Sequence, residues 1–216
     1  MSLKLYAHPF SSYCQKALIA LYENGTPFTF LHLGDEATAA EHRRVWPIGK
    51  MPVLVDGDRA VFEASIVIEH LAIHHPGPVR LIPEDPAAAL EVRMLDRFFD
   101  NYVMTPMQKI VADAIRKPER RDPQGVEEAR ALLDSAYRWL DTTMSGRTWA
   151  VGDAFTLADC AAAPSLFYAD WAHPIGEFPH VHAYRRRLLA RPSFARAVDE
   201  ARPFRQFFPL GAPDRD

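Results

Sequence analysis

The feature that most constrains the fold of this 216-residue chain is a proline-rich break between two stretches of different periodicity. Residues 76–86 hold four prolines in eleven positions, and proline removes backbone hydrogen bonds from both helices and strands. Before the break, alternating apolar runs typical of strands are mixed with helical patterns, whereas after it the alternation nearly disappears. We therefore predict two domains, residues 1–75 and 87–216, joined by a linker at residues 76–86.

The part before the break combines strands and helices. Its first two predicted strands flank a helix, which is the start of a βαβ unit with parallel strands. Further on, Asp56-Gly57 separates two short apolar runs, and this pair of residues is a good signal for a hairpin turn. The predicted order is therefore βαβα-ββα. The predicted strands are residues 3–7, 28–33, 53–55 and 60–62, and the predicted helices are residues 12–24, 37–45 and 65–74.

The part after the break is predicted to be all-α, because its apolar residues recur at spacings of three and four. Three more prolines, Pro203, Pro209 and Pro213, favour an irregular tail over residues 203–216. The predicted helices are residues 87–115, 124–144, 156–171, 179–190 and 192–201.

Composition and charge exclude several classes of protein. Apolar residues make up 48% of the chain and charged residues 25%, which is close to the average for soluble globular proteins. A formal charge of −3 leaves no basic surplus for binding nucleic acid. No stretch approaches the roughly 20 apolar residues of a membrane span, and no secretory signal is recognisable. We expect a cytoplasmic protein with no nucleic-acid or membrane partner.

The cysteines and histidines of the sequence predict neither a disulfide nor a metal site. Cys14 and Cys160 lie far apart, and without an export signal we expect both to be free thiols. Nine histidines are present, but none stands at a recognised metal-ligand spacing within a cluster of other ligands. The sequence therefore predicts no metal cofactor.

Two predicted helix starts carry residues suited to binding anions. Ser11 and Ser12 stand where a strand hands over to a helix, so free N–H groups and the helix dipole would stabilise an anion there. Glu63 and Ser65 stand at a second start, where a hydroxyl and N–H groups suit a carboxylate and the Glu63 side chain suits an ammonium group. In isolation, helix capping and an acidic first turn fully explain these residues.

Four segments resemble the cytosolic glutathione S-transferase family, in particular its serine-type, theta-like and zeta-like members. They are residues 9–14 (PFSSYC), 49–54 (GKMPVL), 62–66 (FEASI) and 151–159 (VGDAFTLAD). The resemblance covers about residues 3–194. It implies an α/β thioredoxin-like N-terminal domain that binds glutathione as co-substrate, followed by an all-α C-terminal domain that shapes the site for a small apolar electrophile. It also implies a homodimer.

The resemblance further assigns roles within the glutathione site. It implies that Ser11, or as second choice Ser12, donates a hydrogen bond to the glutathione thiolate. It implies a cis Met51–Pro52 bond, through which Met51 presents its backbone to the cysteinyl part of glutathione. The implied glutathione-binding residues are Ser11, Lys50, Met51, Pro52, Glu63 and Ser65.

Two alternative activities stay open at this point. Cysteine-type relatives use a thiol for disulfide exchange, and Cys14 is the candidate in this loop, although it matches the buried cysteine of a thioredoxin-like pair. The sequence also departs from the zeta pattern at Tyr13 and from the theta pattern at Tyr13 and Gln15, so the class is open. A glutathione-dependent reductase or isomerase, or a non-catalytic interaction module, is the alternative to a transferase.

The second-substrate site and one structural motif complete the predictions. Thr156 and Asp159 form a capping box at a helix start, and loss of Asp159 is predicted to cost about 1 kcal/mol. Large apolar residues of the loop and helices are candidates for the electrophile site, although such residues more often belong to the core. These candidates are Phe10, Tyr102, Met104, Met107, Tyr168 and Trp171.

Overall fold

Four strands form one mixed sheet in the computed structural model, which describes residues 3–216. The strands lie in the order β2-β1-β3-β4; β1 runs parallel to β2 and antiparallel to β3, and β3 and β4 form an antiparallel hairpin. The parallel pair requires the crossover helix that the sequence predicted between the two strands. The strands are β1 (Leu3–Ala7), β2 (Phe28–His32), β3 (Val53–Asp56) and β4 (Arg59–Phe62).

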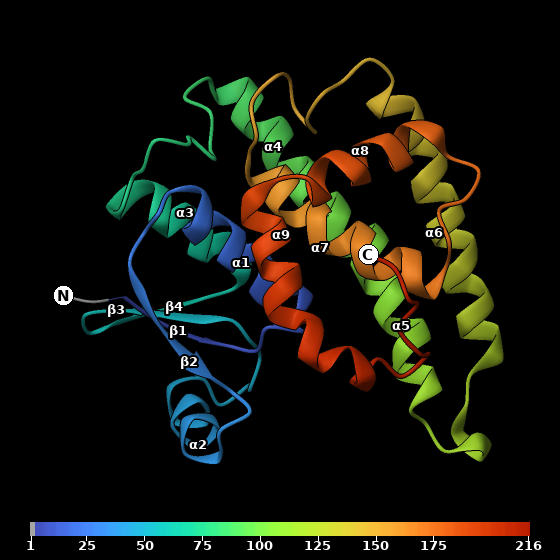
Figure 1. Cartoon of the computed structure of the whole chain (residues 1–216), viewed down its shortest axis with the longest axis horizontal. Helices are drawn as coiled ribbons and strands as arrows, with labels where there is room; N and C mark the ends of the chain where they lie inside the picture. The colour runs from blue at the N-terminus through green and yellow to red at the C-terminus, as the bar shows by residue number, and fades with distance from the viewer. Residues whose placement is uncertain (1–2) are drawn as a thin grey trace.

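Three helices accompany the sheet (Figure 1): α1 (Ser12–Glu23), α2 (Glu36–Val45) and α3 (Ala64–His74). Of these, α1 and α3 contact each other. The apolar stripes of α1 and α3 are buried together with β1 and β3, where Leu5, Leu18 and Ile68 have no exposed surface. The observed order βαβα-ββα confirms the fold class predicted for this part of the chain.

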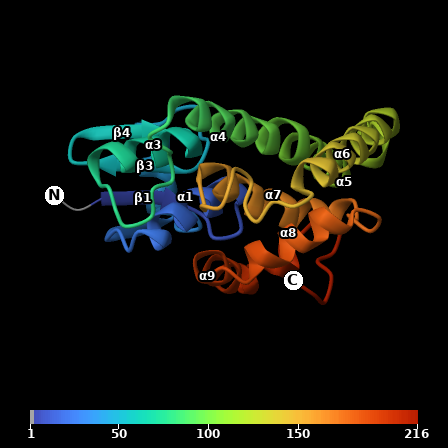
Figure 2. The same cartoon turned by 90° about the horizontal axis from the view of Figure 1, so that it is seen from above.

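The remainder of the described chain is helical, as predicted. Its helices are α4 (Pro86–Phe98), α5 (Thr105–Ala114), α6 (Pro123–Met144), α7 (Leu157–Ala172), α8 (Pro179–Leu189) and α9 (Pro192–Ala201). All residues of α7 are buried, because it lies between α4 on one side and α8 on the other (Figure 2) and also contacts α1. Within residues 3–216, no helix is both long and apolar enough to cross a membrane.

The helix predicted at residues 87–115 changes pitch in its middle. A π-helical segment, Phe99–Met104, joins α4 to α5. Pro106 has no N–H to donate to the carbonyl one turn before it, so the regular hydrogen-bond ladder is interrupted there. The Thr105 hydroxyl donates instead to the Asp100 carbonyl at 2.9 Å. The bounds predicted for this helical stretch are confirmed, but the sequence did not predict the change of pitch.

The predicted irregular tail is wrong in part. A 3₁₀ helix, Arg202–Phe207, follows α9, and the Phe208 side chain after it is only 7% exposed. The ring of Phe208 packs edge-on against Trp171 with centroids 5.2 Å apart, and Phe204 packs against His8 at 4.7 Å. The prolines stop a regular α-helix, but aromatic burial still orders the tail against the rest of the protein.

Candidate active site

A cleft of about 660 Å³ lies between the end of β1, the start of α3 and the α4–α5 region. Its walls bring together five of the six predicted glutathione-binding residues, from three separate segments: Ser11, Lys50, Met51, Pro52 and Glu63. Residues that the sequence did not predict complete the lining: Tyr13 of α1, and Arg97, Asp100, Asn101 and Gln108 of the α4–α5 region. The walls therefore carry side chains of both charge signs, and we call this cleft the polar cleft.

Ser11 occupies the N-cap of α1 and is half-buried at the cleft. Its backbone is extended, with φ −90° and ψ 122°, and its Oγ accepts from the Cys14 N–H at 3.4 Å. That distance is longer than the usual limit of about 3.2 Å for such a bond, so the cap is weak. The hydroxyl lies next to the unpaired first N–H groups of the helix.

The start of α3 forms a second binding feature of the cleft. Glu63 is exposed and has φ 67°, a left-handed conformation that costs a non-glycine residue about 1–3 kcal/mol. This backbone turn places the residue at the N-cap, where the first N–H groups of α3 are not paired within the helix. The neighbouring Met51–Pro52 bond is cis, as the resemblance implied, and exposed Lys50 precedes it.

The Ser65 hydroxyl is engaged in an ionic network between α1, α3 and α4. It accepts from Lys16 Nζ at 2.9 Å, donates to Asp96 Oδ2 at 2.8 Å and contacts Arg97. Lys16 is 1% exposed and also pairs with Asp100 at 2.8 Å. The role of Ser65 as a glutathione ligand stays a prediction, because the Ser65 hydroxyl already has three partners within the protein. Lys16, in the middle of an otherwise apolar helix, is the signal that sequence reasoning missed.

A second, apolar cleft of about 340 Å³ adjoins the first. Phe10, Met107 and Tyr168 of the predicted electrophile site line it. The unpredicted lining residues come from α5 and the tail and include Val111, Ile115, Phe207 and Phe208. Three residues, Phe10, Ser11 and Gln108, line both clefts, so the Ser11 hydroxyl stands at their junction.

Three other candidates for the electrophile site lie away from the walls of the apolar cleft. Met104 is 1% exposed within the core, and Trp171 packs behind Phe10, with ring centroids 6.5 Å apart. Tyr102 is 50% exposed and packs instead against Phe98, at 5.7 Å. Helical spacing alone does not separate these three residues from Met107 and Tyr168, because all five fall on the same two predicted helices, residues 87–115 and 156–171.

Family models match both parts of the chain. Residues 5–79 match the glutathione S-transferase N-terminal domain, and residues 103–192 match the glutathione S-transferase C-terminal domain. The glutathione S-transferase-like protein LUC7 of Fusarium sp is 31% identical over 185 residues, covering 81% of this chain and 82% of LUC7. The chain belongs to the cytosolic glutathione S-transferase family.

Relatives within the family carry different names. A stringent starvation protein A homolog of Coxiella burnetii is 25% identical, covering 92% of each chain. Among solved structures, a glutathione S-transferase of Methylobacterium radiotolerans in complex with glutathione sulfonate is 29% identical. It superposes with a TM-score of 0.79, covering 92% of this chain and 95% of the other. Membership of the glutathione S-transferase family therefore does not by itself fix the activity.

The two other candidates for acting on the thiol, Ser12 and Cys14, differ in exposure from Ser11. Ser12 is 8% exposed and borders only the apolar cleft. Cys14 has no exposed surface, and burial raises the pKa of its thiol to about 11. Cys14 and Cys160 are both free, as predicted. A protonated, enclosed thiol is a poor nucleophile.

The capping box at the start of α7 is confirmed as a structural element. Asp159 has no exposed surface, and its Oδ2 accepts from the Thr156 N–H at 2.8 Å and hydroxyl at 3.1 Å. Its Oδ1 accepts from the Ala150 N–H at 2.9 Å and the Tyr184 hydroxyl at 2.6 Å. Burial raises the pKa of Asp159. The carboxylate joins a loop, a helix start and α8, which is more than a local cap.

Proposed function

We propose that this protein is a glutathione transferase that stabilises the glutathione thiolate with Ser11 and conjugates it to a small apolar electrophile. The observation that carries the proposal is the position of Ser11, which lines both the polar and the apolar cleft. A thiolate held at this hydroxyl has the groups suited to a charged tripeptide on one side. On the other side it has an apolar surface suited to an uncharged second substrate.

Charge complementarity supports glutathione as the ligand of the polar cleft. The Glu63 carboxylate suits the γ-glutamyl ammonium group, and the free N–H groups at the start of α3 suit its carboxylate. Lys50 is exposed at the rim and suits the glycyl carboxylate. Arg97 adds a second cation to the lining of the cleft, although its guanidinium is already paired with Asp96 and Asp100 at 2.6 Å.

Activation of the thiol requires only a modest free energy. A free thiol of this kind has a pKa of about 8.5, and lowering it by two units corresponds to about 2.7 kcal/mol. One hydrogen bond to a charged acceptor contributes roughly 1.5–3 kcal/mol. The Ser11 hydroxyl, helped by the dipole of α1, is therefore sufficient without a metal or a second base.

With an aryl halide, the thiolate sulfur donates its electron pair to the ring carbon, a C–S bond forms, and the halide leaves with the pair of the broken C–halogen bond. The thiol proton has already passed to solvent. The aromatic and aliphatic side chains around the apolar cleft hold the ring over the sulfur, which removes the entropic cost of bringing the two together.

The proposal is tested by two measurements on the same preparation. We expect retention on immobilised glutathione with elution by free glutathione, and conjugation of 1-chloro-2,4-dinitrobenzene at a rate that saturates with glutathione. Retention without conjugation of any member of an electrophile panel would leave binding but reject the transferase. Absence of retention would reject the glutathione site itself.

A glutathione-dependent disulfide reductase is the first alternative. It needs a reactive thiol, and the only cysteine near the cleft is enclosed. Turnover of a glutathione mixed disulfide faster than the aryl halide would favour the reductase. A non-catalytic interaction module is the second alternative. The presence of an intact polar cleft argues against it.

We also propose that the protein forms a homodimer, because the family resemblance implies one. We expect a homodimer at micromolar concentration. Sedimentation that finds only a 24.4 kDa species would count against it.

A further inference from the structure

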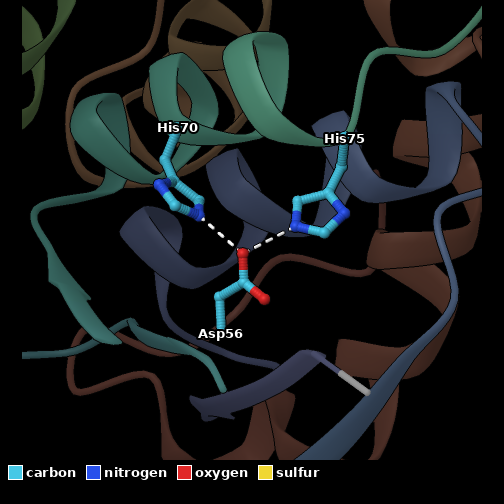
Figure 3. Close-up of side chains that lie close together, drawn as sticks. All are labelled: Asp56, His70 and His75. Carbon is cyan, nitrogen blue, oxygen red and sulfur yellow. Dashed lines mark hydrogen bonds and ion pairs between the residues drawn. The ribbon is translucent and has the colours of Figure 1, made fainter. Parts of the chain in front are cut away.

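Three side chains converge at the end of α3 that lies away from the cleft. Asp56 closes β3, His70 lies in the last turns of α3, and His75 is the C-cap of that helix. The Nε2 atoms of His70 and His75 lie 2.9 and 2.7 Å from the same Asp56 oxygen (Figure 3). One donor atom from each residue lies within 4.8 Å of the other two. Two imidazole nitrogens and one carboxylate oxygen thus face a common point.

The three side chains differ in how firmly they are held. His70 is fixed, because only 6% of its side chain is exposed, whereas the side chains of Asp56 and His75 are 22% and 30% exposed. The second Asp56 oxygen points away from both rings (Figure 3). The cluster therefore has one anchored nitrogen and two ligand groups that can adjust, on a side that solvent reaches.

We propose that Asp56, His70 and His75 form a binding site for a divalent transition-metal ion, with Zn²⁺ as the best match. Zn²⁺ favours imidazole nitrogen and carboxylate oxygen, and sites with three protein ligands keep one position for water. This proposal replaces the expectation of no metal that the histidine spacings gave. The ligands are 14 and 5 residues apart along the chain, so only folding brings them together.

Holding the ion requires the Asp56 oxygen to move away from both rings and the two imidazole nitrogens, which lie within 4.8 Å of each other, to stand about as far apart as each is from the carboxylate. With metal–ligand distances of about 2.0–2.2 Å, neighbouring ligands of a tetrahedral site lie about 3.3 Å apart. The two observed distances of 2.9 and 2.7 Å must therefore open by about half an ångström, which the partly exposed His75 and Asp56 allow. Each imidazole must carry its proton on Nδ1 so that the Nε2 lone pair faces the ion. The carboxylate then exchanges two N–H donors for one cation.

Two other arrangements compete with this site. In the first, the imidazoles only donate hydrogen bonds to Asp56, and the cluster links the hairpin to α3 without an ion. In the second, the ion binds to His70 and His74, which lie one turn apart on α3 with ring centroids 4.4 Å apart. His74 is exposed, and this pair does not need Asp56. The first arrangement predicts no metal binding. The second predicts that binding is lost on substitution of His74 and kept on substitution of Asp56.

The proposed site is separate from the clefts. None of its three residues lines either cleft, and α3 spans 11 residues, about 16 Å, between the Glu63 end and the His75 end. We therefore expect the ion to stabilise the fold by tying β3 to the end of α3. Retention on immobilised glutathione should be unchanged whether the ion is bound or removed.

The test uses the full chain, freed of metal with a chelator and then titrated with Zn²⁺ by calorimetry and with Co²⁺ by visible absorption. We expect one Zn²⁺ per chain with a dissociation constant below about 10 μM, weaker than four-ligand structural sites. Asp56→Asn and His75→Gln should each weaken binding at least tenfold, about 1.4 kcal/mol. The control His180→Gln changes an exposed histidine on α8 and should leave the affinity unchanged.

Three results would overturn the proposal. The first is no heat and no Co²⁺ absorption at 100-fold higher metal concentration, which leaves only the hydrogen-bonded arrangement. The second is loss of binding in His74→Gln with full binding in Asp56→Asn, which moves the ion to the helix pair. The third is equal weakening in His180→Gln, which indicates unspecific binding. Circular dichroism of each variant shows that it is folded, so a lost site is not mistaken for a lost fold.

Discussion

Two helices of this protein start with the same kind of residue and use it differently. Both α1 and α7 have a hydroxyl residue at the N-cap, Ser11 in one and Thr156 in the other. Ser11 is half-buried and makes one long hydrogen bond to its helix, whereas Thr156 is 1% exposed and is locked to the fully buried Asp159. The first helix start is left incompletely paired beside a cleft, and the second is held by a buried carboxylate inside the core.

The difference teaches how one local motif serves two purposes. A cap contributes about 1 kcal/mol to stability when its donors and acceptors are all paired. When the pairing is incomplete and the end is open, the same N–H groups and hydroxyl remain available for a bound anion. The tertiary surroundings, not the capping residue, decide between the two.

Asp159→Ala is the change that most strongly tests the structural half of the comparison. It leaves the Ala150 and Thr156 N–H groups and the Tyr184 hydroxyl buried without their acceptor. Each such group costs about 1–3 kcal/mol, so we expect a loss of about 3–5 kcal/mol in the free energy of unfolding. This exceeds the value of about 1 kcal/mol predicted for a local cap.

Urea denaturation measures that loss, and Asp153→Ala is the matched control because Asp153 is exposed on the preceding loop. The control should shift stability by less than about 0.5 kcal/mol. A folded Asp159→Ala protein of unchanged stability that no longer binds glutathione would reverse the assignment and make the α7 start a functional one.

Ser11→Ala tests the functional side of the comparison, the start of α1. Without the donor, the pKa of the bound thiol should rise, and turnover of an aryl halide should fall at least tenfold, about 1.4 kcal/mol. Glutathione affinity should change little, because the proposed contacts of Glu63 and of the Met51 backbone with the tripeptide do not depend on Ser11. Ultraviolet titration of the bound thiolate measures the pKa directly.

Ser11→Thr separates chemistry from capping, because it keeps both the hydroxyl and the cap. Turnover should recover in Ser11→Thr while it stays low in Ser11→Ala. If both variants retained full turnover, Ser11 would be a cap like Thr156 and the contrast between the two helix starts would disappear.

Cys14→Ala tests whether the neighbouring thiol takes part. We expect stability to fall by about 1 kcal/mol through the small cavity, with turnover unchanged. The folded pKa of about 11 lies above the unfolded value of about 8.5, so the folded state holds this proton more tightly. Its contribution to stability is complete below about pH 8.5 and is lost as the pH rises through 11, and Cys14→Ala removes that part of the slope.

Iodoacetamide labelling of the native protein at neutral pH gives a second measurement on Cys14. The buried, protonated thiol should stay unlabelled until the protein is unfolded. Loss of turnover in Cys14→Ala together with rapid labelling would place the protein with disulfide-exchanging members of its family.

Ser12→Ala should have the smallest effect. The hydroxyl borders only the apolar cleft, so turnover should stay within about twofold, about 0.4 kcal/mol. A large rise in the thiol pKa here, with none in Ser11→Ala, would move the donor one residue along the chain.

The sequence by itself determined where the secondary structure lies. Periodicity and helix caps are local properties, so strands such as residues 3–7 and helices such as 192–201 were predicted with the bounds observed. It also indicated part of the polar cleft, because Ser11 and Glu63 stand at predicted helix starts, and the family resemblance added Met51.

Only the tertiary structure decided which side chains meet. It committed the Ser65 hydroxyl to Lys16, which no spacing connects to it, and it selected Phe10, Met107 and Tyr168 over equally apolar candidates. It also gathered Asp56 with two histidines of α3. These outcomes depend on contacts between segments far apart in the sequence, and the free energy of such contacts comes from packing and burial, which a local pattern does not contain.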